Sequence, residues 1–192
     1  MSWTIERTED NKTVLSEGLR RAIHRASSAS ILMFCSSDDQ GKLSKDDVYP
    51  GHFPDTFKIG AAKASGREAE WTDKNSDYTF PGEDLPVDLP CHLRSNTNNL
   101  ASGSSLATAL ASGMAALLLY CFQICDDSGN PERALQTARI HDNMDRAFRR
   151  MTNKNKQPRY IRAWEHLKPE FKDLPDEDGI EGLKKVMAEL FN

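Results

Sequence analysis

The strongest constraint on the fold is a long apolar segment, residues 105–125, which follows a polar loop rich in asparagine. An apolar segment of this length, with no proline inside it, predicts one continuous helix. Alanine, serine and glycine are frequent on one side of that helix, and small side chains let two backbones approach closely. We therefore expect this helix to pack directly under a sheet.

Two serines, Ser104 and Ser105, stand where this predicted helix begins. The first backbone N–H groups of a helix have no partner within it, and the helix dipole is positive at that end. A negative charge that develops there is stabilised, so the position suits a nucleophile in acyl transfer. The simpler interpretation is a helix N-cap, a position that serine favours in any protein.

Short apolar runs upstream predict the strands of a parallel sheet. Trp3–Ile5 resembles the start of a buried strand, a helix is expected over residues 14–26, and residues 31–35 form the next strand. Strand, helix and strand within about thirty-five residues match the size of a βαβ unit. With further strands expected at 57–62 and 78–80, the predicted fold class is α/β.

The composition changes after residue 125, where Asp127–Pro131 combines turn-forming residues with a helix-starting proline. We therefore divide the chain into residues 1–125 and an α-helical C-terminal extension, residues 126–192. Apolar residues of the extension are spread over several short segments, too thinly for a core of their own. Its helices are expected to pack onto residues 1–125, with Trp164 and Phe171 as the aromatic anchors.

Charge and cysteine usage exclude several classes of function. The 192 residues carry a net charge of −4 and no basic stripe, which argues against a nucleic-acid partner. The longest apolar run, Met114–Cys121, is too short to span a bilayer, so no membrane partner is expected. The four cysteines lack metal-ligand spacing with histidines, which predicts neither a metal site nor a cofactor. Buried free thiols and a start without a signal peptide favour the cytoplasm.

Five segments, in the same order, resemble the sequence blocks of the subtilisin-like serine proteases, the subtilases. The serine block is residues 103–109, Gly-Ser-Ser-Leu-Ala-Thr-Ala, which is similar to the family's G-[ST]-S-x-A-[ST]-P. The other four are residues 1–4 (N-M-S-x-G in the family), 31–41 (A-[AS]-G-N-x-G), 49–61 (Y-P-A/G with V-I-x-V-G-A) and 80–83 (A-P-G). The five blocks are spread over residues 1–125.

The resemblance implies part of a three-layer α/β domain with a parallel sheet, and a role for several residues. Ser105 falls on the catalytic serine, which forms an acyl-enzyme with a peptide or protein substrate. Asp39 falls on the asparagine that donates to the oxyanion. Substrate-binding positions of the family fall on Ser2, Trp3 and Thr4, which would pair with the peptide backbone, and on Ser36, Ser37 and Asp38, which would line the pocket for the residue before the cleaved bond.

The chain departs from the family in two respects. Residues 1–192 contain neither the D-[ST]-G block nor the H-G-[TS]-H block, which hold the other two members of the catalytic triad. The five histidines fall outside the family's catalytic positions: His24, His52, His92, His141 and His166. In addition, an ionised Asp39 only accepts hydrogen bonds and would repel an oxyanion.

Two hypotheses follow. In the first, the chain is the C-terminal half of a subtilase endopeptidase, inactive by itself, whose catalytic Asp and His lie in an upstream segment of a longer parent chain or have been lost. In the second, it is a non-catalytic pseudoprotease or relic that acts as a binding or regulatory module. The missing triad members motivate both.

Overall fold

The computed structural model describes residues 1, 4–6, 8–40, 48–88, 99–125, 131–153, 157–167 and 176–191. At its centre lies a five-stranded sheet with the strand order β2-β4-β5-β9-β8. The strands are β2 (Phe34–Ser36), β4 (Phe57–Ala62), β5 (Tyr78–Pro81), β9 (Gln157–Ile161) and β8 (Thr152–Asn153). The first four run parallel to one another, and β8 pairs antiparallel with β9. This sheet with its flanking helices confirms the α/β class.

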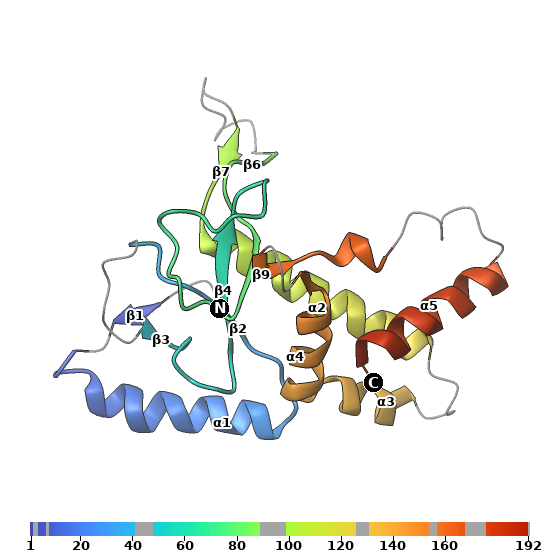
Figure 1. The fold of residues 1–192 in the computed structure, drawn as a ribbon. Coiled ribbons are helices and arrows are strands. Elements are labelled where there is room, and N and C mark those ends of the chain that lie inside the picture. Colours follow the sequence, from blue (N-terminus) through green and yellow to red (C-terminus); the bar gives the residue numbers. More distant parts are fainter. Residues whose placement is uncertain are drawn as a thin grey trace.

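Several helices lie beside this sheet, and two small β-ladders lie apart from it (Figure 1). The helices are the π-helical turn η1 (Val14–Leu19), α1 (Arg20–Ser28), α2 (Ser104–Ile124), α3 (Pro131–Ala138), α4 (His141–Arg150), the 3-10 turn η3 (Ala163–Glu165) and α5 (Asp176–Phe191). The ladders are β1 (Ile5–Glu6) with β3 (Val48–Tyr49), and β6 (Leu85–Pro86) with β7 (Leu100–Ala101).

Helix α2 packs against β2, β4 and β5 through a row of mostly small residues, as the sequence predicts. Ala107, Ala111, Ala115 and Leu118 form this buried row, and their spacing of three and four residues places them on one helix face. Within the described residues α2 is the one helix long and apolar enough to cross a membrane, a test that core helices of soluble proteins also pass. Of its most apolar stretch 33% is buried, and the buried residues lie on the face that packs under the three strands.

Residues from the C-terminal region enter the same hydrophobic core as the sheet. Phe148 of α4 is fully buried among four aromatic rings of the strands, with ring centroids 5.3–6.0 Å away. Met187 and Leu190 of α5 belong to this core as well. The division of the chain at residue 125 stays a prediction, but α4 and α5 share the core of the preceding residues.

Two expectations for the C-terminal region are wrong. It is not entirely helical, because β9 pairs with β5 and extends the main sheet, with Tyr160 and Ile161 buried. Trp164 is not an anchor, since 56% of its surface is exposed and its neighbour Ala163 is buried instead. Phe171, the other expected anchor, lies outside the described residues.

The N-terminal residues also differ from the expected buried strand. Ile5 is exposed and pairs with β3 outside the main sheet. Met1 instead lies alongside β2, where its carbonyl accepts a hydrogen bond from Ser36 N at 3.0 Å and its amino group donates to the Phe34 carbonyl. A two-residue ladder at the molecular surface buries little, so the apolar Ile5 stays in contact with solvent.

Candidate active site

The carboxyl ends of β2, β4 and β5 meet the first turn of α2, and this junction holds the polar residues singled out in the sequence. Gly82, directly after β5, brings the two together, since Gly103 N donates to its carbonyl at 2.8 Å. A Cβ atom at position 82 would lie 2.7 Å from the Ala61 side chain, closer than any real contact. Glycine is therefore required for this close approach of the chain before α2 to the sheet.

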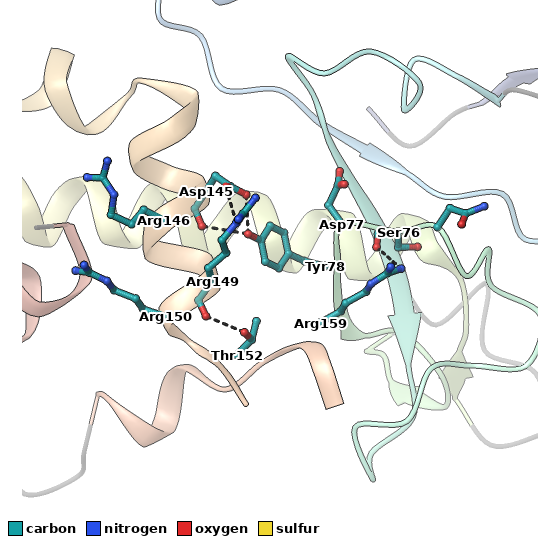
Figure 2. Close-up of a pocket in the computed structure, with 10 residues that line it drawn as sticks. Ser76, Asp77, Tyr78, Asp145, Arg146, Arg149, Arg150, Thr152 and Arg159 are labelled. Carbon is teal, nitrogen blue, oxygen red and sulfur yellow. Dashed lines mark hydrogen bonds and ion pairs between the residues drawn. The ribbon is translucent and has the colours of Figure 1, made fainter. Parts of the chain in front are cut away.

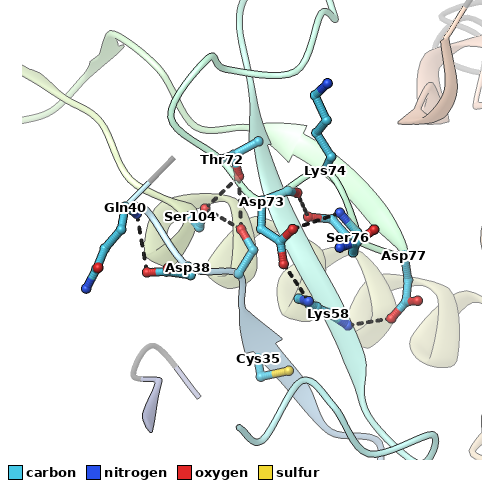
Figure 3. A network of polar contacts seen from close by, with 12 residues as sticks. Cys35, Asp38, Gln40, Lys58, Thr72, Asp73, Lys74, Ser76, Asp77 and Ser104 are labelled. Carbon is cyan, nitrogen blue, oxygen red and sulfur yellow. Dashed lines mark hydrogen bonds and ion pairs between the residues drawn. The ribbon is translucent and has the colours of Figure 1, made fainter. Parts of the chain in front are cut away.

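Three buried side-chain hydroxyls, of Ser37, Thr72 and Ser104, form what we call the hydroxyl cluster. Figure 3 labels Thr72 and Ser104 of this cluster. The Oγ atom of Ser37 lies 2.8 Å from Ser104 Oγ and 2.9 Å from Thr72 Oγ1. Thr72 Oγ1 lies 3.2 Å from Ser104 Oγ and accepts a hydrogen bond from Ala61 N of β4. The cluster thus joins the end of β2, the strand β4 and the start of α2.

Asp39 anchors the same helix from outside the cluster. Its Oδ2 atom accepts a hydrogen bond from Ser104 N at 3.1 Å, and its Oδ1 atom accepts the Ser104 hydroxyl at 2.5 Å. Both carboxylate oxygens therefore act as acceptors, at the end of the helix where the dipole favours negative charge. Asp39 serves as the helix cap that α2 otherwise lacks, because its own N-cap residue, Gly103, has no side chain.

Ser105 is the second residue of α2, so the prediction that it lies at the helix N-terminus is confirmed. Its neighbour Ser104 is completely buried in the hydroxyl cluster, whereas Ser105 is partly exposed. Because Ser104 is fixed by Asp39, Ser37 and Thr72, the backbone that carries Ser105 is fixed as well. This arrangement places a partly exposed serine at the positive end of a helix.

The structure brings some of the expected substrate-binding residues to this junction. Ser36, Ser37 and Asp38 are buried at the end of β2, and Asp38 Oδ1 accepts a hydrogen bond from Gln40 N. Thr4 is half-buried next to β1, while Ser2 and Trp3 lie outside the described residues. Ser37 contributes to the hydroxyl cluster, a contact that orients α2. The roles of these residues in substrate binding stay predictions.

The loop Thr72–Asp77 completes the junction, although its residues predict no more than a polar surface loop. Lys58 Nζ of β4 lies 2.6 Å from Asp73 Oδ2, with both side chains largely buried. Burial opposes the charged form of Asp73, but hydrogen bonds from Lys58 and from Asn75 N outweigh it, and the pKa of Asp73 is lowered. Lys58 N also donates to Asp77 Oδ2, where burial raises the pKa of Asp77. Single polar residues in a loop, such as Thr72 or Asp73, form no sequence pattern from which their contacts could be predicted.

Each described histidine has a partner or a position away from the hydroxyl cluster. His141 stacks on Phe57, at the opposite end of β4 from Ala61, with ring centroids 4.1 Å apart. His166 Nε2 lies 3.1 Å from the Arg150 carbonyl, His52 packs beside Tyr49, and His24 lies on α1. His92 lies outside the described residues. A general base must reach the nucleophile's proton, and these contacts hold His141 and His166 elsewhere.

Metal-ligating residues do not gather at the junction. Within the described part of the chain no three His, Cys, Asp or Glu side chains are placed to hold a metal ion. Cys35 and Cys121 are free thiols, and burial raises the pKa of Cys35 to about 11. A thiol with so high a pKa is protonated at neutral pH and is a weak nucleophile.

Removal of the Asp39 carboxylate is expected to destabilise the protein. In Asp39→Ala, the backbone N–H and the buried hydroxyl of Ser104 lose their acceptor, and loss of a helix cap costs about 1–2 kcal/mol. Asp39→Asn keeps one acceptor oxygen, so its stability should lie between those of the wild type and Asp39→Ala. Urea denaturation of the three proteins checks this order, and Asp39→Ala with wild-type stability would contradict the anchoring role.

Comparison with known proteins agrees with this architecture. The model of the subtilase family matches residues 1–157. The solved lanthipeptide protease superposes with a TM-score of 0.61 at 19% identity, over 86% of this chain and 59% of that one. The prenylagaramide maturation protease PagA superposes with a TM-score of 0.52 at 20% identity, over 86% of this chain and 55% of that one.

The self-cleaved protease domain of PatA gives a TM-score of 0.53 at 16% identity, over 89% of this chain and 55% of that one. At these identities the likeness shows a shared fold. The chain spans 55–59% of the length of these three structures. Comparison with curated proteins finds no match.

Proposed function

Since the chain belongs to the subtilase family, we propose that it carries the nucleophile half of a serine endopeptidase site, with Ser105 as the nucleophile. The carrying observation is the placement of Ser105 on the first turn of α2, partly exposed, beside a Ser104 that is fixed by three side chains. Such a position combines a partly exposed serine with a rigid backbone and a positive helix end.

In this proposal the Ser105 hydroxyl attacks the carbonyl carbon of a peptide bond while a base accepts its proton. The tetrahedral intermediate collapses to an acyl-enzyme as the protonated amine leaves, and water then releases the acid and restores the serine. The histidine base and its aspartate partner come from outside residues 1–192, either from an upstream segment or from a second chain. The substrate is a peptide or a protein.

Asp39 limits this chemistry. It occupies the position of the family's oxyanion donor, but both of its oxygens accept hydrogen bonds from Ser104. Loss of one such donor costs about 100- to 1,000-fold in rate in a subtilase. The same observation favours the second candidate function, a non-catalytic module that keeps the fold and binds peptides without cleaving them.

The test is hydrolysis of peptide nitroanilides by the 192-residue chain and by the same chain joined, before Met1, to a subtilase segment that contains the D-[ST]-G and H-G-x-H blocks. We expect no activity from the chain alone, because an unassisted serine hydroxyl is a weak nucleophile. The joined chain should be active, and Asp39→Asn should raise its kcat by about 100-fold or more, since the amide supplies a donor.

Matched serine variants make the test specific. Ser105→Ala should abolish the activity of the joined chain, whereas Ser112→Ala should keep it. Ser112 lies two turns after Ser105 on α2, where its hydroxyl donates to the Thr108 carbonyl. Hydrolysis by the chain alone that disappears in Ser105→Ala would show that the base lies within residues 1–192. A folded but inactive joined chain that binds peptides would favour the non-catalytic module.

A further inference from the structure

A cleft of about 850 Å³ lies between α4 and the segment that leads into β5, with β9 beside it (Figure 2). Four arginines line it: Arg146, Arg149 and Arg150 from α4, and Arg159 from β9. We call it the arginine cleft. Its described lining includes two carboxylates, Asp77 and Asp145, so the lining carries a formal charge of +2 (four minus two), whereas the whole chain carries −4.

One of the carboxylates is already neutralised. Asp145 Oδ2 lies 2.7 Å from Arg149 Nε, and Asp145 Oδ1 accepts the Tyr78 hydroxyl at 2.7 Å. The Asp145 charge raises the pKa of Arg149, so this guanidinium stays charged at any physiological pH. The Arg149 side chain is nevertheless 72% exposed and can contact a ligand from solvent.

The other arginines are held in place by backbone carbonyls. Arg159 Nη1 donates to the carbonyls of Ser76, at 2.8 Å, and Lys74. Arg146 Nη1 and Arg150 Nη1 donate to carbonyls in the last turn of α5. A guanidinium has five N–H donors, and these contacts engage a single nitrogen of each group. The cleft thus holds guanidinium groups in fixed positions, and each has N–H donors beyond these contacts.

The size and charge pattern of the arginine cleft select the kind of anion. Guanidinium groups match carboxylates and phosphates through paired hydrogen bonds. The volume exceeds that of one small anion, and the arginines come from both sides, which suits several anionic groups on one extended ligand. Asp77 and Asp145 interrupt the positive lining and would repel the unbroken charge of a nucleic-acid backbone. Carboxylates spaced along a peptide fit this alternation.

We propose that the arginine cleft binds an acidic peptide segment, with side-chain carboxylates paired to Arg149 on one side and Arg159 on the other. The site is separate from the candidate active site, because it lies where β5 begins, whereas Gly82 and α2 meet where β5 ends. The proposal therefore stands whether or not Ser105 is a nucleophile.

The test uses fluorescence anisotropy of a labelled hexaglutamate peptide with the full 192-residue chain at low salt. Binding should saturate and weaken as sodium chloride is added, since salt screens exposed charges. Arg149→Gln should weaken binding by about 1.5- to 5-fold, the range expected for one exposed charge pair, and the double variant with Arg159→Gln should weaken it further. Arg21→Gln is the matched control, because it makes the same charge change on α1, which does not line the cleft. It should leave the affinity unchanged.

Several outcomes would overturn the proposal. One is that Arg149→Gln binds hexaglutamate as tightly as the wild type, and another is that Arg21→Gln loses as much affinity as Arg149→Gln. A third is that a single-stranded oligonucleotide binds more tightly than hexaglutamate. Displacement of the peptide by inorganic phosphate, but not by sodium chloride of the same ionic strength, would indicate a single-anion site and count against a peptide. Arg159→Gln can lower the melting temperature, because Arg159 also holds backbone carbonyls. In that case the affinity of the exposed Arg149→Gln variant decides whether the proposal stands.

Discussion

Replacement of Phe148 by alanine is expected to lower the free energy of unfolding by about 3–5 kcal/mol, the range for a buried phenylalanine. Phe148 is fully buried on α4 and contacts aromatic rings from β2, β4 and β5. Its loss would leave a cavity between the helix and three strands that their rigid backbones cannot close. Chemical denaturation of the full chain, followed by circular dichroism, measures the change.

Trp164→Ala is the matched control for this variant. Trp164 is also aromatic and also lies in the C-terminal region, but it is more than half exposed and contacts Tyr160 edge-on. Its replacement should change the stability by less than about 1 kcal/mol. Equal losses in the two variants would mean that α4 does not share the core of the sheet.

Deletion of residues 176–192 is also expected to have a large effect. The shortened chain should no longer form a folded monomer. This segment contains α5, whose buried Met187, Leu190 and Phe191 pack in the main core, with Phe191 against Phe122 of α2. Their removal would expose an apolar surface on α2 and α4, and such surfaces promote association. Size-exclusion chromatography and thermal melting of the shortened chain measure both consequences.

Point variants on α5 grade this effect. Leu190→Ala alone should cost about 2–5 kcal/mol because the side chain is completely buried. Lys185→Ala, on the exposed side of the same helix, should cost little. A shortened chain that remains monomeric and melts at the wild-type temperature would show that α5 is a dispensable appendage.

The elements that sequence predicts well here are those with a strong local pattern. The apolar segment of α2 and the short buried runs at 57–62 and 78–80 each carry enough hydrophobicity to identify a helix or a strand without knowledge of the rest. The position of Ser105 on the first turn of α2 follows from the abrupt change from a polar loop to this apolar segment.

What sequence misses depends on contacts between distant residues. Strand β9 reads Gln-Pro-Arg-Tyr-Ile, which has no clear alternation, and becomes a strand because β5 offers it a free edge. Thr72 joins the hydroxyl cluster only once the loop folds back over β4. The arginine cleft needs α4, β5 and β9 together, and the spacing of its arginines along the chain gives no indication of this.

Gly60 of β4 touches both of the sites described above. A Cβ atom there would lie 2.4 Å from Ser76 Oγ and 3.2 Å from Thr72 Oγ1. Thr72 belongs to the hydroxyl cluster, while the Ser76 carbonyl orients Arg159 in the arginine cleft. A larger residue at position 60 would displace one loop that serves two purposes. A single substitution at position 60 is therefore expected to disturb the helix anchor and the peptide-binding cleft together, although the two sites lie at opposite ends of β5.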